Sequence, residues 1–239
     1  GAGRGAGRGR SRRSTAGGSN AGKDKREWLS EAEAKHLLAA YGIPVVDTRI
    51  VSSGAEAAKI ADELGYPVAL KILSPDITHK SDVGGVALGL ESAEAVSEAA
   101  SRMLSRVARF HPGADIDGFT VQQMVRKPDA FELILGIVDD ATFGPVLLFG
   151  QGGTAVEVIR DKAMALPPLN KVLADDLISR TRVSRLLEGY RGHAPADRDA
   201  IAAALMALGD LAADNPEVAK LDINPLWADG DGIVALDAR

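Results

Sequence analysis

The chain contains no cysteine, few aromatic residues and no long apolar run. The absence of cysteine from its 239 residues excludes disulfides, thiol nucleophiles and thiolate metal sites. Aromatic residues make up 4% of the chain and hydrophobic residues 46%, so aliphatic side chains must build the core. No segment approaches the roughly 20 consecutive apolar residues of a transmembrane helix, and the polar N-terminus shows no secretory signal. We therefore expect a cytoplasmic protein with no membrane partner.

Residues 1–26 differ sharply from the rest of the chain. They carry a net charge of +7, which leaves −12 on the remaining residues. Because they include no apolar side chain larger than alanine, we expect a disordered, basic linker or leader. An Arg-Gly tract can also bind RNA, but no aromatic residue lies among these arginines, so we expect no nucleic-acid partner. The first residue is Gly1, which suggests a processed chain or a piece of a longer one.

The remaining sequence predicts a mixture of helices and strands in two lobes. In the first half, helices are expected at residues 31–41, 55–64 and 93–110, and strands at residues 45–51, 68–73 and 86–90. In the second half, strands are expected at residues 120–126, 132–138, 146–149, 155–159, 218–223 and 233–237, and a helix at residues 196–213. The change near Gly118 predicts a small lobe over residues 27–118 and a large lobe over residues 119–239, with a ligand cleft between them.

Lys71 lies inside an apolar strand, and an unusually long polar loop follows it. A buried ammonium needs an anionic partner, which a nucleotide phosphate would supply; on a half-exposed strand, Lys71 would simply face solvent. His79 lies in the loop, where neutral imidazole is a competent nucleophile toward a phosphoryl group, although an exposed histidine often has no chemical role. Gly84 and Gly85 at the end of the loop allow backbone to approach phosphates closely.

The closing strands predict an oxygen-rich cation site. The turn sequence DGDG at residues 229–232 sets a register in which Asn224 faces Asp237, with Asp222 two residues away on the same face. Two carboxylates and an amide oxygen suit Mg²⁺ shared with phosphates. An ordinary hydrated polar face remains the alternative.

A glycine-rich turn, GQGG at residues 150–153, follows the strand at residues 146–149. Gly152 and Gly153 are candidates to present backbone N–H groups to an anion, although the turn lacks the Gly-Lys-Ser/Thr ending of a P-loop. Glu132 opens an otherwise apolar strand. A buried carboxylate there requires a hydroxyl, cation or metal partner, whereas a strand-edge glutamate would face solvent.

Four segments in this order resemble the ATP-grasp domain of nucleoside-diphosphate-forming acyl-CoA synthetases. This group includes the ADP-forming acetate–CoA ligases and is related to succinyl-CoA synthetase. The segments are SEAEAKHLLAAYGIPV, GYPVALKILSPDITHKSDVGGV, FELILGIVDDATFGPVLLFGQGG and LDINPLWADGDGIVALDAR. The resemblance covers residues 28–239 and implies an α+β ATP-grasp fold whose two lobes hold the nucleotide between them.

The resemblance also implies a role for each candidate residue. Lys71 matches the lysine that binds the nucleotide phosphates, His79 a mobile-loop histidine that relays a phosphoryl group, and Glu132 a residue near the adenine pocket. The residues matching the adenine-lining hinge are Gln122, Gln123, Met124 and Val125. Those matching the metal site are Asn224 and Asp237, with Asp222 in support. The glycines of the two turns, Gly84, Gly85, Gly152 and Gly153, complete the expected nucleotide site.

The implied reaction is reversible, Mg²⁺-dependent phosphoryl transfer between ATP or ADP and a phosphohistidine, coupled to acyl-CoA synthesis from a small carboxylic acid. The CoA-binding and ligase halves of such enzymes are not among these residues. We therefore expect CoA to bind through a partner domain or subunit. The alternative is a non-catalytic, ligand-sensing synthetase-like domain of a protein acetyltransferase.

Overall fold

The computed structural model describes residues 28–77, 80–153, 161–190 and 192–239. The basic segment 1–26, His79 and the strand expected at residues 155–159 lie outside the described residues. No helix within the described ranges is long and apolar enough to cross a membrane.

The small lobe is an antiparallel four-stranded sheet in the order β1-β4-β2-β3. Its strands are β1 (Thr48–Val51), β2 (Val68–Leu73), β3 (Val86–Leu90) and β4 (Gly118–Gln123), and its helices are α2 (Gly54–Leu64) and α3 (Ala93–Phe110). Ser53 and Ser92 cap the two helices, as their side chains accept backbone N–H groups of the first turn. Buried β2 residues Leu70 and Ile72 belong to the same core as buried alanines of both helices. Both strands predicted around the polar loop are confirmed.

The large lobe is an antiparallel five-stranded sheet in the order β7-β6-β5-β8-β9. Its strands are β5 (Phe131–Asp140), β6 (Gly144–Gln151), β7 (Lys162–Ala165), β8 (Lys220–Asp229) and β9 (Gly232–Ala235), and its helices are α5 (Lys171–Ser179), α6 (Ser184–Leu187) and α7 (Arg198–Asp214). Leu133, Leu135 and Ile137 alternate along β5 and belong to the core that α7 also enters.

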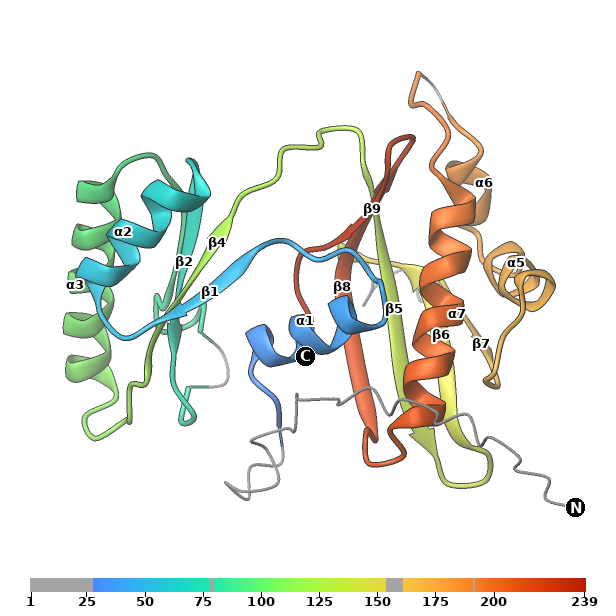
Figure 1. The fold of residues 1–239 in the computed structure, drawn as a ribbon, viewed down its shortest axis with the longest axis horizontal. Helices are drawn as coiled ribbons and strands as arrows, with labels where there is room; N and C mark the ends of the chain where they lie inside the picture. The colour runs from blue at the N-terminus through green and yellow to red at the C-terminus, as the bar shows by residue number, and fades with distance from the viewer. Residues whose placement is uncertain (1–27, 78–79, 154–160, 191) are drawn as a thin grey trace, which may run out of the picture.

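Helix α1 (Glu31–Ala40) begins with the predicted capping box, in which the Ser30 and Glu33 side chains bond each other's backbone N–H groups. Its buried residues Ala34 and Leu38 belong to the core of the large lobe. Figure 1 shows α1 between the two sheets, while α2 and α3 cover the outer side of one and α7 covers the outer side of the other. The inner faces of the two sheets therefore face each other across α1.

The boundary between the lobes differs from the expected one near Gly118. Strand β4 starts there but pairs with β1 and β2, so it belongs to the small lobe. Helix α1 precedes the small lobe in sequence and packs in the large one. The chain therefore enters the small lobe after α1 and leaves it after β4, through residues 124–130.

The register predicted for the closing hairpin is confirmed. Strands β8 and β9 pair from Asp229↔Gly232 to Leu226↔Ala235, and an Ile223↔Ala238 bridge continues the register after the cis Asn224–Pro225 peptide. Asn224 and Asp237 therefore hold opposite positions between two paired stretches.

Candidate functional site

Lys71 has the anionic partner that its place in an apolar strand requires, and the partner is a carboxylate of the protein. Its Nζ donates to Glu31 Oε1 at 2.6 Å, and its side chain is 14% exposed. Lys80 Nζ lies 4.0 Å from the other Glu31 oxygen. Neighbouring Leu70 and Ile72 are buried in the small-lobe core, so Lys71 points away from that core, toward α1. Sequence reasoning missed Glu31.

Lys35 of α1 is the second cation bound to Glu31. It is 2% exposed, and its Nζ donates to Glu31 Oε1 at 2.8 Å, to Gln122 Oε1 at 2.9 Å and to Thr48 Oγ1 at 3.1 Å. Burial lowers the pKa of Lys35, and the Glu31 carboxylate opposes that effect. With three acceptors for three N–H groups, Lys35 is fully hydrogen-bonded and fixes α1 to β1 and β4.

Three of the four residues expected to line the adenine pocket make side-chain hydrogen bonds within the protein. The Gln122 side-chain oxygen is bound by Lys35. Gln123 Nε2 donates to the Leu64 carbonyl at 3.0 Å, and Met124 Sδ accepts the Gly89 N–H at 3.0 Å. Among the four residues expected to line this pocket, Val125 lines a cavity.

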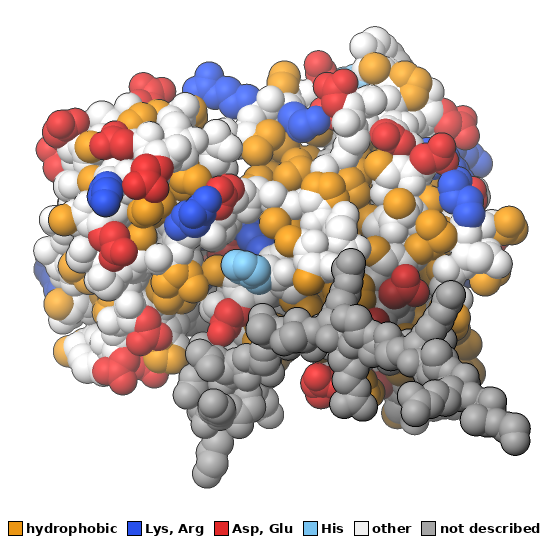
Figure 2. All heavy atoms as spheres, in the orientation of Figure 1, with side chains coloured by type: hydrophobic (Ala, Val, Ile, Leu, Met, Phe, Trp, Pro, Cys, Tyr) orange, Lys and Arg blue, Asp and Glu red, His pale blue; other side chains and the backbone are white. Residues whose placement is uncertain are grey.

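That cavity has a volume of about 430 Å³ and lies beside the connection between the lobes. Its lining residues are Val125, Arg126, Lys127, Pro128, Ala130, Glu132 and Trp227. Lys127 bonds both carboxylate oxygens of Asp229, at 2.7 and 2.6 Å, which ties the connection to the closing hairpin. On the face drawn in Figure 2, hydrophobic side chains gather where the two lobes meet. The lining combines apolar side chains with the charged side chains of Arg126, Lys127 and Glu132, a mixture that suits a ligand with both apolar and polar groups.

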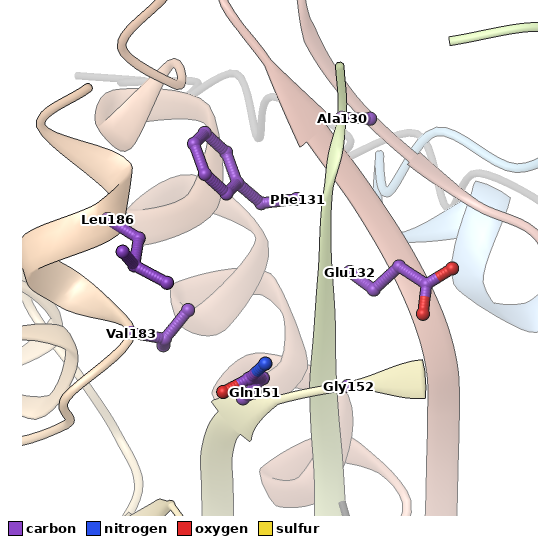
Figure 3. A pocket seen from close by; sticks show the side chains of 7 residues that line it. All are labelled: Ala130, Phe131, Glu132, Gln151, Gly152, Val183 and Leu186. Carbon is purple, nitrogen blue, oxygen red and sulfur yellow. The ribbon is translucent and has the colours of Figure 1, made fainter. Parts of the chain in front are cut away.

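A second cavity of about 250 Å³ lies over the other side of β5. Figure 3 shows Phe131, Val183 and Leu186 on one side of this strand and Glu132 on the opposite side. The Glu132 carboxylate therefore points toward the inner face of the large-lobe sheet. Glu132 is an exposed residue of β5, so the structure agrees with a solvent-facing glutamate and not with a buried carboxylate, although Glu132 also lines the cavity beside the connection between the lobes.

The glycine turn after β6 packs tightly, and its N–H groups are occupied. Gly152 N–H donates to the Glu132 carbonyl at 2.8 Å, and Gly153 N–H donates to Asn224 Oδ1 at 3.0 Å. A Cβ on Gly153 would lie 1.7 Å from Glu132 Oε2. These glycines permit a close approach of backbone to β5 and β8. Their N–H groups, expected to face an anion, are bonded within the protein.

Gly84 and Gly85 behave similarly in the small lobe. Gly84 has φ +67° and donates to Ser81 O at 3.0 Å, and Gly85 donates to Lys80 O at 2.7 Å. The Arg106 guanidinium occupies the space that a Gly84 Cβ would need. Both glycines shape the end of the loop, and their N–H groups are likewise bonded within it.

The two acidic residues of the expected metal site face different charges. Burial and the Glu31 carboxylate raise the pKa of Asp237, which Lys71 and Lys35 oppose; its side chain keeps access to solvent. Burial raises the pKa of Asp222, and there the opposing charges are Lys220, Lys162 and Arg239. The charges of Glu31, Lys71 and Lys35 therefore act on Asp237, whereas those of Lys220, Lys162 and Arg239 act on Asp222.

The donor set fits a magnesium ion better than a transition metal. The described residues include no group of three or more His, Asp or Glu side chains that could hold a metal. Asn224 and Asp237 supply an amide oxygen and a carboxylate at opposite positions of the hairpin. Mg²⁺ is commonly bound by one or two carboxylates together with substrate phosphates and water, so this sparse set suits a metal that arrives with a nucleotide.

Together these residues form a charged centre between the lobes. It contains the ammonium groups of Lys35, Lys71 and Lys80 and the carboxylates of Glu31 and Asp237. Its net charge of +1 attracts anions. His79, the expected phosphoryl carrier, immediately precedes Lys80 but lies outside the described residues.

Comparison with known proteins gives consistent matches. The model of a family described as an ATP-grasp domain matches residues 20–239. The chain is 38% identical over 211 residues to the acetate–CoA ligase [ADP-forming] I subunit beta of Pyrococcus furiosus, covering 88% of this chain and 90% of that subunit. It is 41% identical over 208 residues to acetate–CoA ligase [ADP-forming] I of Archaeoglobus fulgidus, covering 87% of this chain but 30% of that protein.

A solved structure of dinucleotide forming acetyl-coenzyme A synthetase 1 from Ca. Korarchaeum cryptofilum, in complex with coenzyme A, Ca-AMPCP and HgCl⁺, superposes with a TM-score of 0.86 at 41% identity. The match covers 91% of this chain and 94% of that one. Another structure of that synthetase contains coenzyme A and Mg-AMPPCP, with its phosphohistidine segment pointing towards the nucleotide binding site; its TM-score is 0.80 at 38% identity, over 92% of this chain and 94% of that one.

Proposed function

This chain belongs to the ATP-grasp domain family, and we propose that it is the nucleotide-binding part of an ADP-forming acyl-CoA synthetase of the acetate–CoA ligase type. It catalyses reversible phosphoryl transfer between ATP or ADP and a histidine. The observation that carries this proposal is the position of Lys71, whose ammonium group reaches from the small-lobe sheet to Glu31 of α1 at 2.6 Å and whose charge also acts on Asp237.

The nucleotide lies between the two sheets in this proposal. Its base enters the cavity lined by Val125, Glu132 and Trp227, and its phosphates extend toward Lys71 and Lys80. The ammonium of Lys71 has three N–H groups and gives one to Glu31, so others remain for phosphate oxygens. Catalysis of phosphoryl transfer rests mainly on such positioning and on neutralisation of charge.

Asn224 and Asp237 would hold Mg²⁺, and the bound ion would neutralise charge on the transferring phosphoryl group. Gly153 keeps the Asn224 side-chain oxygen in place through its N–H group. The solvent access of Asp237 leaves its carboxylate available to a ligand that enters from the cleft.

The phosphoryl acceptor in this proposal is His79. A lone pair of its imidazole forms a phosphorus–nitrogen bond, and ADP leaves with the electron pair of the broken phosphorus–oxygen bond. The reverse reaction makes ATP. A partner binds the acyl group and CoA. The chain matches 90% of a relative that is named a beta subunit but 30% of a longer relative, so the remaining functions of the longer protein would lie outside this chain. The partner is a CoA-binding subunit or domain, and the acyl substrate is a small carboxylic acid.

Transfer of label from γ-labelled ATP tests this function. The chain is incubated with Mg²⁺, alone and with its CoA-binding partner, and protein-bound label is tested for acid lability and base stability. We expect a phosphohistidine that disappears in His79→Ala and persists in His36→Ala, which alters an exposed histidine of α1. Nucleotide binding with no label on the wild-type chain, even with the partner, contradicts the enzymatic proposal and favours a ligand sensor.

A further inference from the structure

Glu31 joins the two lobes through a single carboxylate. It lies on α1, whose apolar side packs in the large-lobe core. Lys71, which it binds at 2.6 Å, lies on β2 in the sheet of the small lobe. The contact therefore spans the cleft in which we place the nucleotide, and it reaches the ammonium group assigned to the phosphates.

The Glu31 carboxylate is well defined in place and charge. Its side chain is 8% exposed. Burial acts to raise its pKa, but Lys71 and Lys35 outweigh burial and hold the pKa below its usual range. The carboxylate is therefore ionised at neutral pH and has two ammonium groups within 2.8 Å.

Lys35 restricts the position of the Glu31 carboxylate. Lys35 also bonds Thr48 of β1 and Gln122 of β4, and it is almost completely buried. Glu31 and Lys35 lie one turn apart on the same helix. Lys71 carries a flexible four-carbon side chain, so in the Glu31–Lys71 pair the glutamate is the fixed member and the lysine the movable one.

We propose that Glu31 is the positioning residue for Lys71 in phosphoryl transfer. It holds the ammonium group at the cleft in the geometry that the phosphates require, while leaving the remaining N–H groups free for them. The inference rests on the proposed function, since it takes Lys71 as the phosphate-binding lysine. Protein kinases contain a comparable ion pair between a strand lysine and a helix glutamate, and that pair must be in place for phosphoryl transfer.

A double-mutant cycle tests this role in the complete protein with its partner. The variants are Glu31→Gln, Lys71→Met and the double variant, and the main readout is the single-turnover rate of transfer from saturating γ-labelled ATP to protein. Gln keeps the size of Glu31 and an acceptor for Lys35, so the fold is expected to persist, which thermal unfolding checks. Glu98→Gln is the control because it removes the same charge from an i,i+4 pair exposed on both sides.

If Glu31 acts through Lys71, Glu31→Gln slows transfer by about tenfold or more in the wild-type background and by less than about twofold when Lys71 is already Met. Glu98→Gln leaves the rate unchanged. If Glu31→Gln lowers the transfer rate equally in both backgrounds, Glu31 has a general structural role. If it does not lower the rate in the wild-type background, Glu31 has no role in transfer. Tighter ATP binding with an unchanged rate makes Glu31 a competitor for Lys71. Each of these three results overturns the proposal.

Failure of the proposed function gives a different result. A wild-type protein that takes no label, or a Lys71→Met variant that transfers at the normal rate, contradicts the assigned function whatever Glu31 does. The same cycle measured on Mg-ADP dissociation constants by calorimetry then decides the inference. We expect Glu31→Gln to weaken Mg-ADP binding in the wild-type background but not in the Lys71→Met background. An equal change in both backgrounds, or no change in either, refutes the coupling.

Discussion

Asn224 accepts a hydrogen bond from the Gly153 N–H through its side-chain oxygen at 3.0 Å. The contact links the start of the closing hairpin to the glycine turn after β6, although the two residues are separated by 71 positions in sequence. Because Asn224 also faces Asp237 across the hairpin, the glycine turn and the proposed metal ligands are held as one unit. Changes to the turn are therefore expected to reach the metal-binding step.

Gly153→Ala should destabilise the protein. Gly153 has φ +72°, and an added Cβ would lie 1.7 Å from Glu132 Oε2, so the variant combines backbone strain with displacement of the carboxylate. We expect a loss of about 2–4 kcal/mol in the free energy of unfolding, measured by chemical denaturation. Gly144→Ala is the matched control, because Gly144 also has φ +72° but no atom within 4 Å of the added Cβ. Equal losses in the two variants would show that the Glu132 contact contributes nothing.

Lys71→Met should weaken nucleotide binding. The variant keeps an apolar stem of similar length on β2 and removes one charge, so it tests the ammonium group itself. We expect ADP affinity to fall by about 10- to 100-fold, the range of a charge-assisted hydrogen bond of about 1.5–3 kcal/mol, measured by calorimetry. Lys59→Met is the control, as it removes the same charge from an exposed position of α2. Unchanged ADP affinity in Lys71→Met would contradict the assigned role.

Asp237→Asn should raise the Mg²⁺ requirement. Asparagine is close to isosteric with aspartate but lacks the charge that attracts a divalent cation. We expect the Mg²⁺ concentration for half-maximal label transfer to rise by about tenfold or more. Asp231→Asn, in the exposed turn of the same hairpin, should leave the magnesium titration unchanged. A titration that is the same for Asp237→Asn and the wild-type chain would exclude Asp237 as a ligand.

The Lys127–Asp229 pair should contribute stability that depends on pH. The hydrogen bonds from Lys127 hold the pKa of Asp229 below its ordinary value of 3.8. A carboxyl with a lowered pKa in the folded state stabilises it above the unfolded pKa, and the contribution is lost as the pH falls through the folded pKa. Lys127→Met should therefore cost roughly 1 kcal/mol at pH 7 and progressively less below about pH 4. Urea denaturation at several pH values measures this, and a pH-independent difference would contradict the assignment.

Local patterns in the sequence predicted much of the fold. The capping box at Ser30, the strands around the polar loop and the register of the closing hairpin depend on neighbouring residues and turn chemistry, and the structure confirms all three. Strand ends were less certain, because β4 ends at Gln123 whereas the pattern extends to Arg126. Residues 124–130 leave the sheet to reach the other lobe, and only tertiary structure determines where that departure occurs.

Tertiary partners of polar residues could not be predicted in this way. Glu31 lies 40 positions from Lys71 and reads in the sequence as an ordinary acidic residue in the first turn of a helix. Gln122 was expected near a base, but its side-chain oxygen is bound by Lys35, 87 positions away. Lys35 gave no signal either, because a lysine on a helix usually faces solvent and its burial is evident only in the structure.

The small lobe is inserted into the large one, so two chain segments, and not one, connect them. One follows α1 and the other follows β4, and they run side by side where the Gln123 N–H donates to the Asp47 carbonyl at 3.3 Å. Movement of the small-lobe sheet away from α1 would have to break the hydrogen bonds of Lys35 to Thr48 and Gln122 as well as that of Lys71 to Glu31. A cut in either segment alone would still leave the lobes joined by the other.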